Sequence, residues 1–205
     1  VKVDPETEIT ITAGATQAIF CVIAAFVRPG DEVILLEPCY DSYRPSVETV
    51  GGTPVIHSIY APDYRVDWKA VQQLITPRTR MLCINTPQNP TGTILTEADM
   101  LSIQDILRGT NVLLMSDEVY EHLVYDSKHH IPALTIEGLK DRTIAVYSFG
   151  KTFHNTGWKV GYAIAAPALM TEFRKVHQFN VFCVNSFVQY GLSDYLAKYD
   201  TWREL

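Results

Sequence analysis

The sequence predicts an α/β fold, a mostly parallel sheet with helices on both faces. Two observations predict this fold class: short apolar runs of strand length recur along the chain, and amphipathic stretches of helical length lie between most of them. Strands that alternate with helices favour a parallel sheet, because each parallel connection crosses over one face. The apolar runs are Glu32–Leu36, Met81–Ile84, Val112–Met115 and Thr143–Tyr147.

The earlier helical stretches have recognisable ends. A first helix is expected at about Thr16–Val27, and Arg28-Pro29-Gly30 ends it, because glycine adopts the left-handed conformation that closes a helix. Trp68–Ile75 is amphipathic, and Glu97–Leu107 follows Thr96, whose hydroxyl is suited to cap the first turn.

The C-terminal part is expected to be helical from Pro167 to Lys198, and Arg203–Leu205 still lie in a helix-like pattern. The first residue, Val1, is not an initiator methionine. We therefore expect a piece of a longer protein. The apolar residues expected to form a buried stripe here are Met170, Phe173, Val176, Phe187 and Leu192.

Length and charge narrow the function classes. Of the 205 residues, 47% are hydrophobic, enough for one sizeable core. A net charge of -6 leaves no basic stripe for a phosphate backbone, so we expect no nucleic-acid partner. No apolar run approaches the roughly 20 residues that cross a bilayer, and no leader opens the chain. We expect no membrane partner and a cytoplasmic location.

The four cysteines are expected to be reduced. Cys21, Cys39, Cys83 and Cys183 are scattered and form no C-x-x-C pair, and three of them lie among apolar neighbours. We therefore expect thiols in the core rather than disulfides.

Polar residues follow the apolar runs where each predicted strand ends. In an open parallel sheet these carboxyl ends face one crevice, so residues far apart in the sequence converge there. We expect Asn89, Asp117 and Lys151 to surround one ligand. The polar segments are Glu37-Pro38, Asn85-Thr86-Pro87, Ser116-Asp117 and Ser148-Phe149-Gly150-Lys151.

The start of the first helix is suited to an anion. At Gly14-Ala15-Thr16-Gln17 the strand-like Ile9–Ile11 passes into that helix, whose amide groups and dipole favour a phosphate. The Thr16 hydroxyl adds a donor. Ser148 and Lys159 complete the cradle, and the lysine neutralises charge on the anion.

Four segments of the chain stand out as motifs: GATQA at 14–18, NTPQNPTG at 85–92, DEVY at 117–120 and SFGKTFHNTGWKVGY at 148–162. They resemble the successive motifs of class I/II aminotransferases, which are enzymes of fold type I. Their order and spacing also agree with that family, and the sequence through Gln178 is similar to it. The resemblance implies the large, cofactor-binding domain of that fold and pyridoxal 5'-phosphate as cofactor.

The resemblance implies a role for each matching residue. Lys151 forms a Schiff base with the cofactor and moves the proton at the substrate carbon, while Asp117 keeps the pyridine nitrogen protonated. Asn89 and Tyr120 bind the phenolate oxygen, and Tyr40 lies on the ring face.

The resemblance also implies a phosphate site and a nearby backbone feature. Asn85 supports the loop beside the phosphate, and the Asn89-Pro90 peptide is expected to be cis, since proline lowers the cis penalty. The residues expected at the phosphate are Ala15, Thr16, Ser148 and Lys159.

One position departs from many relatives, which have arginine where this chain has Lys159. The lysine form resembles the branch of methionine, glutamine and kynurenine aminotransferases, so we expect a donor of methionine, glutamine or aromatic type. The residues that agree with this branch are Asp41, Tyr43, Trp158 and Lys175-Val176-His177-Gln178.

The resemblance also defines the expected domain. Residues 1–205 form the large domain and enter the linker helix near 170–205, while the N-terminal arm and the C-terminal small domain are absent. The small domain carries the family's arginine for the substrate carboxylate. We therefore expect little transamination from these 205 residues alone.

Three functions compete. The first is an aminotransferase acting on an amino acid and a 2-oxo acid, as a homodimer. The second is a pyridoxal-phosphate β-lyase of cysteine conjugates, which uses the same lysine and aspartate. The third is a non-enzymatic module that senses the cofactor.

Several residues also have a structural interpretation. Lys151 is then a surface lysine, Asp117 caps a helix at Glu118, and Lys159 pairs with a surface acid. The motif context favours the functional interpretation of these residues. Tyr43 is equally suited to packing and to the site.

The histidines are expected to serve packing or the surface. His129-His130 forms the densest local group, and we interpret it as a solvated loop, because adjacent side chains rarely chelate one ion. His57, His154 and His177 are isolated in the sequence. No metal site is proposed.

Overall fold

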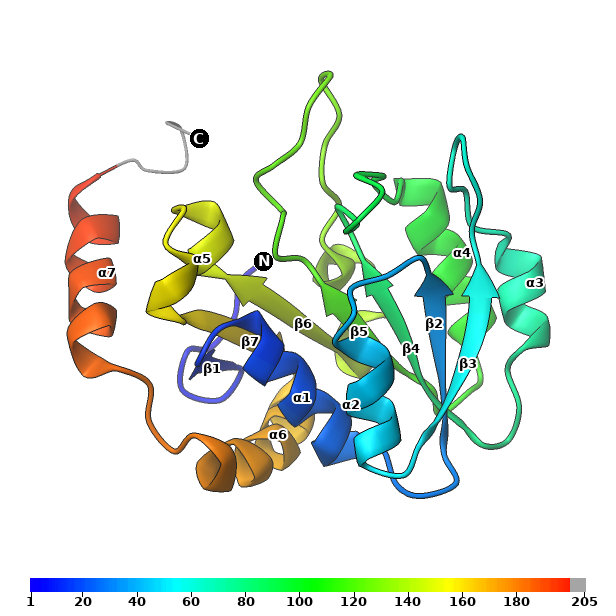
Figure 1. The fold of residues 1–205 in the computed structure, drawn as a ribbon, viewed down its shortest axis with the longest axis horizontal. Helices are drawn as coiled ribbons and strands as arrows, with labels where there is room; N and C mark the ends of the chain where they lie inside the picture. The colour runs from blue at the N-terminus through cyan, green and yellow to red at the C-terminus, as the bar shows by residue number, and fades with distance from the viewer. Residues whose placement is uncertain (200–205) are drawn as a thin grey trace.

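A computed structural model describes residues 1–199 and confirms the predicted α/β class (Figure 1). Its sheet has seven strands in the order β1-β7-β6-β5-β4-β2-β3. Neighbouring strands pair in parallel through β3, β2, β4, β5 and β6. Strand β7 is antiparallel to β6 and to β1. The strands are β1 Ile9–Thr12, β2 Glu32–Glu37, β3 Thr53–Ser58, β4 Thr79–Asn85, β5 Leu113–Asp117, β6 Thr143–Ser148 and β7 Gly161–Ala165.

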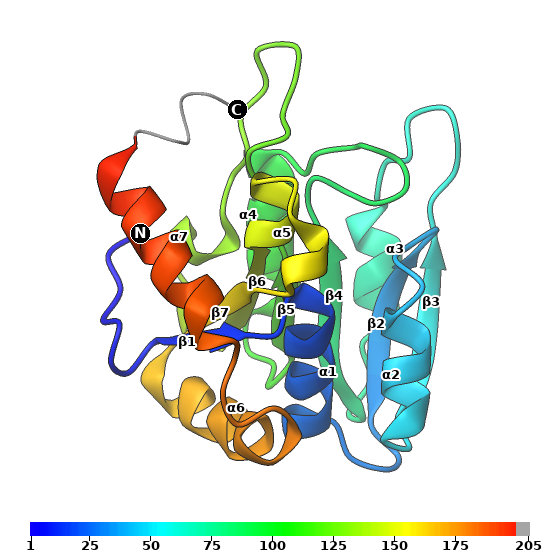
Figure 2. The same ribbon diagram turned by 60° about the vertical axis from the view of Figure 1, so that its left-hand side comes forward.

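Helices cover both faces of the sheet. One face packs against α1, α2 and α6, and the other against α3 and α4, as Figures 1 and 2 show. The helices are α1 Ala15–Phe26, α2 Tyr43–Thr49, α3 Trp68–Gln73, α4 Glu97–Leu107, α5 Phe149–Thr152, α6 Pro167–Asn180 and α7 Ser186–Lys198.

Burial on both faces explains why the central strands are continuous apolar runs. In β2, Val33 and Leu35 join the core under α1, while Ile34 and Leu36 join the core under α3 and α4. Successive side chains of a strand point to opposite faces, so a two-sided core requires apolar residues at every position.

The start of α4 confirms the predicted cap. The Thr96 hydroxyl accepts a hydrogen bond from the Asp99 amide, and the Asp99 carboxylate accepts one from the Thr96 amide, which forms a capping box. The Trp68 indole also donates to Asp99 at 2.8 Å. This carboxylate therefore joins α3 to α4.

The end of the first helix differs from the prediction. The helix ends at Phe26, and Gly30, at φ 93°, lies in the turn that leads to β2 rather than in the helix-closing position. Pro29 lies between the end of α1 at Phe26 and the turn at Gly30, and its ring cannot continue a helix.

The C-terminal part corrects two expectations. The helical stretch is interrupted between Asn180 and Ser186, and Phe187 is 90% exposed rather than buried, because α7 stands apart from the sheet (Figures 1 and 2). Met170, Phe173 and Leu192 are buried as predicted. The expected helix-like pattern at 203–205 lies outside the described residues.

The cysteines are free, but not all of them are in the core. Cys21 and Cys83 are buried and Cys39 is half-buried, while Cys183 is exposed. The prediction of a core thiol is therefore wrong for Cys183, which lies in the segment between α6 and α7.

Gly161 brings β7 close to the start of α1. A Cβ at this position would overlap the Tyr147 carbonyl oxygen and lie 3.2 Å from the Ala15 amide nitrogen. We expect Gly161→Ala to lower the free energy of unfolding by about 1–3 kcal/mol, because backbone atoms have to move apart. Urea unfolding of this variant and of Gly157→Ala, whose new Cβ has no neighbour within 4 Å, checks this. Equal stability of the two variants would contradict it.

Candidate active site

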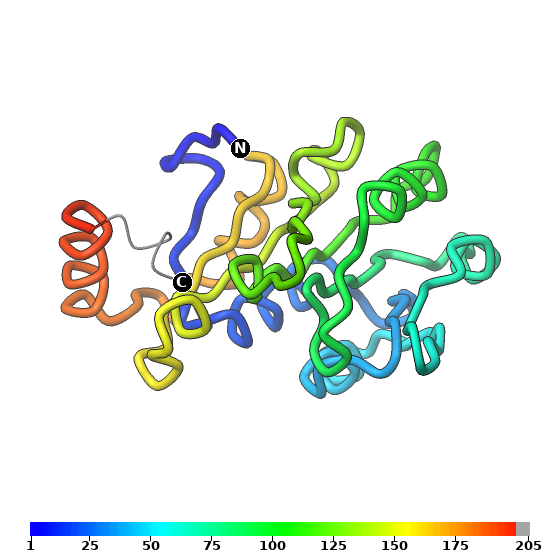
Figure 3. The backbone as a smooth tube through the Cα atoms, turned by 90° about the horizontal axis from the view of Figure 1, so that it is seen from above, coloured from blue at the N-terminus to red at the C-terminus, as the bar shows by residue number. Residues whose placement is uncertain are grey.

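The site lies at the carboxyl edge of the sheet, where β4, β5 and β6 end. Asn85 and Asp117 are partners in the β4–β5 register, so their side chains start side by side. Figure 3 views the molecule onto this edge. Every residue predicted for the site lines one pocket there, as the crevice argument expects. They are Ala15, Thr16, Tyr40, Asn85, Asn89, Asp117, Tyr120, Ser148, Lys151 and Lys159.

Asp117 places a buried carboxylate in this pocket. Asp117 is 2% exposed. The Tyr43 hydroxyl donates a hydrogen bond to Asp117 Oδ2 at 2.6 Å, and the Val119 amide donates one to Oδ1 at 3.3 Å. Burial raises the pKa of this carboxyl to about 6, and the two donors oppose that rise. No helix begins at Glu118 in the described chain, so the interpretation of Asp117 as a helix cap is wrong.

Asn85 connects the neighbouring backbone segments. Its Nδ2 donates to the Asp117 carbonyl oxygen at 2.9 Å, and its Oδ1 accepts from the Asn89 amide at 2.7 Å. The side chain therefore fixes the loop that carries Asn89. The expected cis peptide at Asn89-Pro90 is confirmed.

Lys151 extends into the pocket from α5. Its Nζ lies 5.7 Å from the centroid of the Tyr120 ring, and the residue is half-buried. The Thr156 hydroxyl donates to the Gly150 carbonyl oxygen at 3.2 Å and holds the turn beside the lysine. The interpretation of Lys151 as a solvated surface lysine is therefore wrong.

The start of α1 forms the opposite wall. Gly14 caps this helix at φ 81° without a side-chain hydrogen bond, and the first turn has no acidic residue. The Lys159 Nζ lies 3.5 Å from the place of a Cβ on Gly14, so glycine leaves room for the ammonium. Thr16 and Tyr40 are joined through their hydroxyls at 3.1 Å. Free amides, a helix dipole and a lysine together favour an anion.

Two contacts were not anticipated. Tyr43, left undecided between packing and function, does both, because its ring is buried against α1 and its hydroxyl binds Asp117. Tyr43 is the first residue of α2, and no local pattern in the sequence shows that its hydroxyl meets Asp117, which lies 74 positions further along the chain. The bond from Thr156 to Gly150 was missed, although Thr156 lies inside the fourth motif.

The histidine expectation is only partly right. His129 is exposed, but the His130 side chain is 7% exposed and its Nε2 lies 2.9 Å from the Glu118 carboxylate. Its burial depends on a tertiary contact that the local sequence does not show.

Among residues 1–199, no three His, Cys, Asp or Glu side chains form a group that could hold a metal ion. Nor is any helix there long and apolar enough to span a membrane.

We expect Tyr43→Phe to raise the pKa of Asp117 above its value of about 6, because the variant loses the phenol that stabilises the carboxylate. Infrared difference titration of the cofactor-free protein, with Asp117→Asn as the reference, measures this pKa. Tyr40→Phe is the control, since the Tyr40 hydroxyl contacts Thr16. The same pKa in both phenylalanine variants would show that the Tyr43 bond has no effect.

Residues 1–203 match the aminotransferase class I and II family, and the chain belongs to this family. It is 42% identical to a methionine aminotransferase of Escherichia coli, over 98% of this chain and 54% of that protein. It is 40% identical to a probable N-succinyldiaminopimelate aminotransferase of Mycobacterium tuberculosis, over 98% and 51%. It is 36% identical to kynurenine–oxoglutarate transaminase 1 of Rattus norvegicus, over 88% and 45%. The chain spans about half the length of these relatives.

Solved structures agree with the family. A crystal structure from Escherichia coli, in which a methionine aminotransferase function was identified, superposes with a TM-score of 0.96 at 41% identity. The superposition covers 98% of the present chain and 54% of the Escherichia coli chain. Cystalysin of Treponema denticola, at a TM-score of 0.82 and 25% identity over 86% and 46%, contains pyridoxal 5'-phosphate. Pyridoxal phosphate is the cofactor of this family of aminotransferases.

Proposed function

We propose that this chain is the large, cofactor-binding domain of an aminotransferase, which moves an amino group from an amino acid to a 2-oxo acid. The observation that carries the proposal is the convergence of Lys151 and Asp117 in one pocket beside the start of α1. An amine, a buried carboxylate and an anion cradle are the three groups that pyridoxal phosphate requires.

The residues of the pocket fit this cofactor. Asp117 is a buried carboxylate whose pKa is raised to about 6, mainly by burial, and a protonated pyridine nitrogen is a matching partner. Lys151 is the covalent attachment point, as the family resemblance implies, and Tyr40 lies on the ring face. Asn89 and Tyr120 bind the phenolate oxygen.

The phosphate group belongs at the opposite wall. The free amides at the start of α1, near Ala15 and Thr16, bind it with help from the helix dipole. Lys159 adds an ammonium and Ser148 a hydroxyl. Asn85 supports the site through the adjoining loop.

The reaction then divides between cofactor and protein. Bound pyridoxal phosphate supplies an electron sink for the substrate carbon. With the cofactor bound, the Lys151 amine would accept the proton from the substrate Cα and deliver it to C4′ of the cofactor. Asp117 keeps the ring nitrogen protonated, and Tyr43 holds the carboxylate in its ionised form and orientation.

The donor we propose is methionine, glutamine or an aromatic amino acid. The lysine at position 159 and the similarity to methionine and kynurenine aminotransferases support this class. The relative named for N-succinyldiaminopimelate is almost as similar, so a direct comparison of substrates decides.

We also propose a homodimer in the cytoplasm. Exposed aromatic side chains gather around α7 and the end of α6, and a second subunit would bury them. The four free thiols agree with a reducing compartment. The exposed aromatic residues are Phe179, Phe182, Phe187 and Tyr190, each at least 76% exposed.

A single-turnover experiment on the loaded, full-length protein tests the function. Methionine alone is expected to yield one equivalent of its 2-oxo acid and no ammonia, and glutamine and kynurenine are compared with it. A β-lyase would instead release ammonia and pyruvate from a cysteine conjugate. Cofactor binding without a 2-oxo acid, ammonia or pyruvate would identify the sensing module. Either the β-lyase result or the sensing-module result would contradict the proposal.

A further inference from the structure

We infer that Glu118 is a positioning residue, whose buried carboxylate holds in place the segment that carries Asp117 and Tyr120. No motif role was assigned to it. The inference rests on the proposed function only where cofactor binding is the readout.

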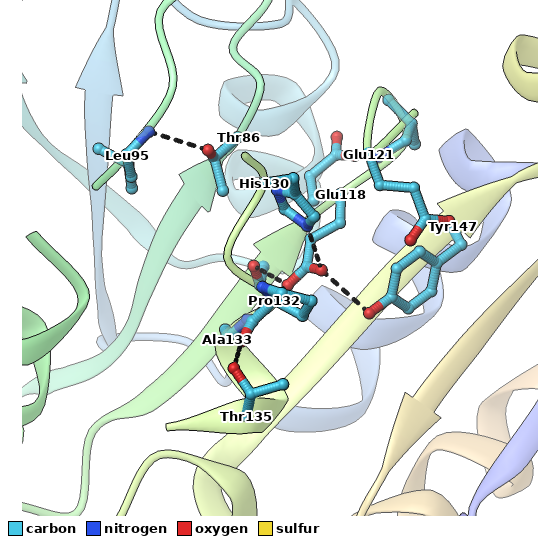
Figure 4. A network of polar contacts seen from close by, with 12 residues as sticks. Thr86, Leu95, Glu118, Glu121, His130, Pro132, Ala133, Thr135 and Tyr147 are labelled. Carbon is cyan, nitrogen blue, oxygen red and sulfur yellow. Dashed lines mark hydrogen bonds and ion pairs between the residues drawn. The ribbon is translucent and has the colours of Figure 1, made fainter. Parts of the chain in front are cut away.

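Glu118 and Asp117 point to opposite sides of the chain. Asp117 is the last residue of β5 and lines the pocket, while Glu118 follows it and is fully buried at 0% exposure. Successive residues of an extended strand alternate between faces, which explains the divergence. Figure 4 shows the Glu118 carboxylate surrounded by other segments.

Each carboxylate oxygen has two hydrogen-bond partners. Oε1 accepts from the Ser116 hydroxyl at 2.8 Å and from the Ala133 amide at 3.0 Å. Oε2 accepts from the Tyr147 hydroxyl at 3.0 Å and lies 2.9 Å from His130 Nε2. These contacts occupy the four lone-pair positions of an ionised carboxylate.

The partners come from three parts of the chain. Ser116 belongs to β5, Tyr147 belongs to β6, and His130 and Ala133 lie where the chain returns from a long loop (Figure 1). The carboxylate therefore joins two strands to the far end of that loop.

Tyr120 lies inside the loop that this carboxylate closes. Between β5 and residue 133 the described chain forms turns and no helix or strand. Its local bonds include Glu121 amide to Glu118 carbonyl at 3.0 Å and Leu123 amide to Tyr120 carbonyl at 2.8 Å. The first end of the loop is also held by a backbone bond from the Glu118 amide to the Val146 carbonyl at 2.9 Å. The Glu118 side chain adds the bonds that join this end to His130 and Ala133 at the other end.

A buried carboxylate is an unfavourable way to fill space. An apolar side chain of similar volume stabilises a fold as well or better, because ionic groups lose their hydration on burial. Glu121 lies close by, and burial, followed by the charge of Glu118, raises its pKa to about 7. What a carboxylate provides, and an apolar side chain does not, is directional bonding to three segments at once.

Glu118→Gln tests the inference, because the amide keeps the shape but replaces two acceptor positions with donors. We expect hydrogen exchange in residues 117–123 to accelerate about ten-fold or more, and the dissociation constant for pyridoxal phosphate to rise about ten-fold. Exchange is measured by mass spectrometry on the cofactor-free, full-length protein, and binding by titration with pyridoxal phosphate.

Glu32→Gln is the matched control. Glu32 is also buried and bonded, by Thr76 and Arg78, but at the amino end of β2. We expect this variant to lose stability without faster exchange at 117–123 and without weaker cofactor binding. Tyr147→Phe, which removes one bond to Glu118, should show the same changes as Glu118→Gln with about a three-fold effect, and it replaces that variant if the glutamine fails to fold.

Two results would overturn the inference. One is exchange at 117–123 and cofactor affinity within two-fold of the parent in Glu118→Gln, or in Tyr147→Phe if that variant is used. The other is an increase in exchange at 117–123 and in the dissociation constant that is no larger in Glu118→Gln than in Glu32→Gln, when the two variants lose the same stability. If the parent protein fails to bind pyridoxal phosphate, the proposed function fails, and the exchange rates alone decide the role of Glu118.

Discussion

Lys151→Ala is expected to lower transamination by about 10²- to 10⁴-fold or more, because the variant lacks both the covalent attachment point and the base at the substrate Cα. The visible absorbance of the loaded protein should also disappear. Initial rates with methionine and a 2-oxo acid, together with absorbance spectra, measure these effects on the full-length protein.

The control for this variant is Lys175→Ala. Lys175 is on the exposed side of α6 and pairs only with Glu172 in the described structure, at 2.6 Å. We expect it to retain parent activity and absorbance. A visible band that survives in Lys151→Ala and disappears in another lysine variant would reassign the attachment point.

Asp117→Asn is expected to reduce the rate by about 10²- to 10³-fold, because the neutral amide no longer holds the ring nitrogen protonated in a buried site. Cofactor affinity should fall as well. The rate is measured at saturating pyridoxal phosphate, so that chemistry is separated from binding. A rate within three-fold of the parent would show that Asp117 does not serve the ring nitrogen.

The same variant should stabilise the cofactor-free protein at neutral pH. Burial raises the pKa of Asp117 from 3.8 to about 6. Ionising this carboxyl therefore costs more free energy in the folded protein than in the unfolded chain. This contribution to stability is fully present below pH 3.8 and is lost as the pH rises from there through about 6. Asp117→Asn avoids that loss, which is worth up to roughly 3 kcal/mol. Urea unfolding at pH 5 and pH 8 measures the part of this loss that falls above pH 5, roughly 1.4 kcal/mol. An equal stability difference between variant and parent at both values would contradict the sign.

Local signals in the sequence predicted the central elements well. The run at residues 33–36 is apolar at every position because both faces of β2 are buried there, and the cap at Thr96 depends only on residues within one turn of α4. The two strands that were not predicted have weaker patterns. Strand β3 is an edge strand that contains Pro54, and β7 is built mostly from small residues.

The site was predictable because its residues lie at strand ends and helix starts, where topology alone brings them together. Every residue predicted for the cofactor site lines the same pocket. What the sequence did not show depends on side-chain contacts between distant segments. Tyr43 meets Asp117 across 74 positions of sequence, and the buried His130 side chain contacts the Glu118 carboxylate 12 positions away. Phe187 fits the apolar stripe of a helix, but the pattern alone does not show whether another part of the chain packs against that stripe, and Phe187 is exposed.

The central claim is that Lys151 and Asp117 hold one pyridoxal phosphate molecule between them. The most direct measurement is reduction of the loaded protein with borohydride, followed by digestion and mass spectrometry of the peptides. We predict that the cofactor mass is attached to the peptide that contains Lys151, and that Asp117→Asn weakens this labelling at limiting cofactor. Labelling of a different lysine, such as Lys159, or of none in the loaded parent protein, would contradict the claim.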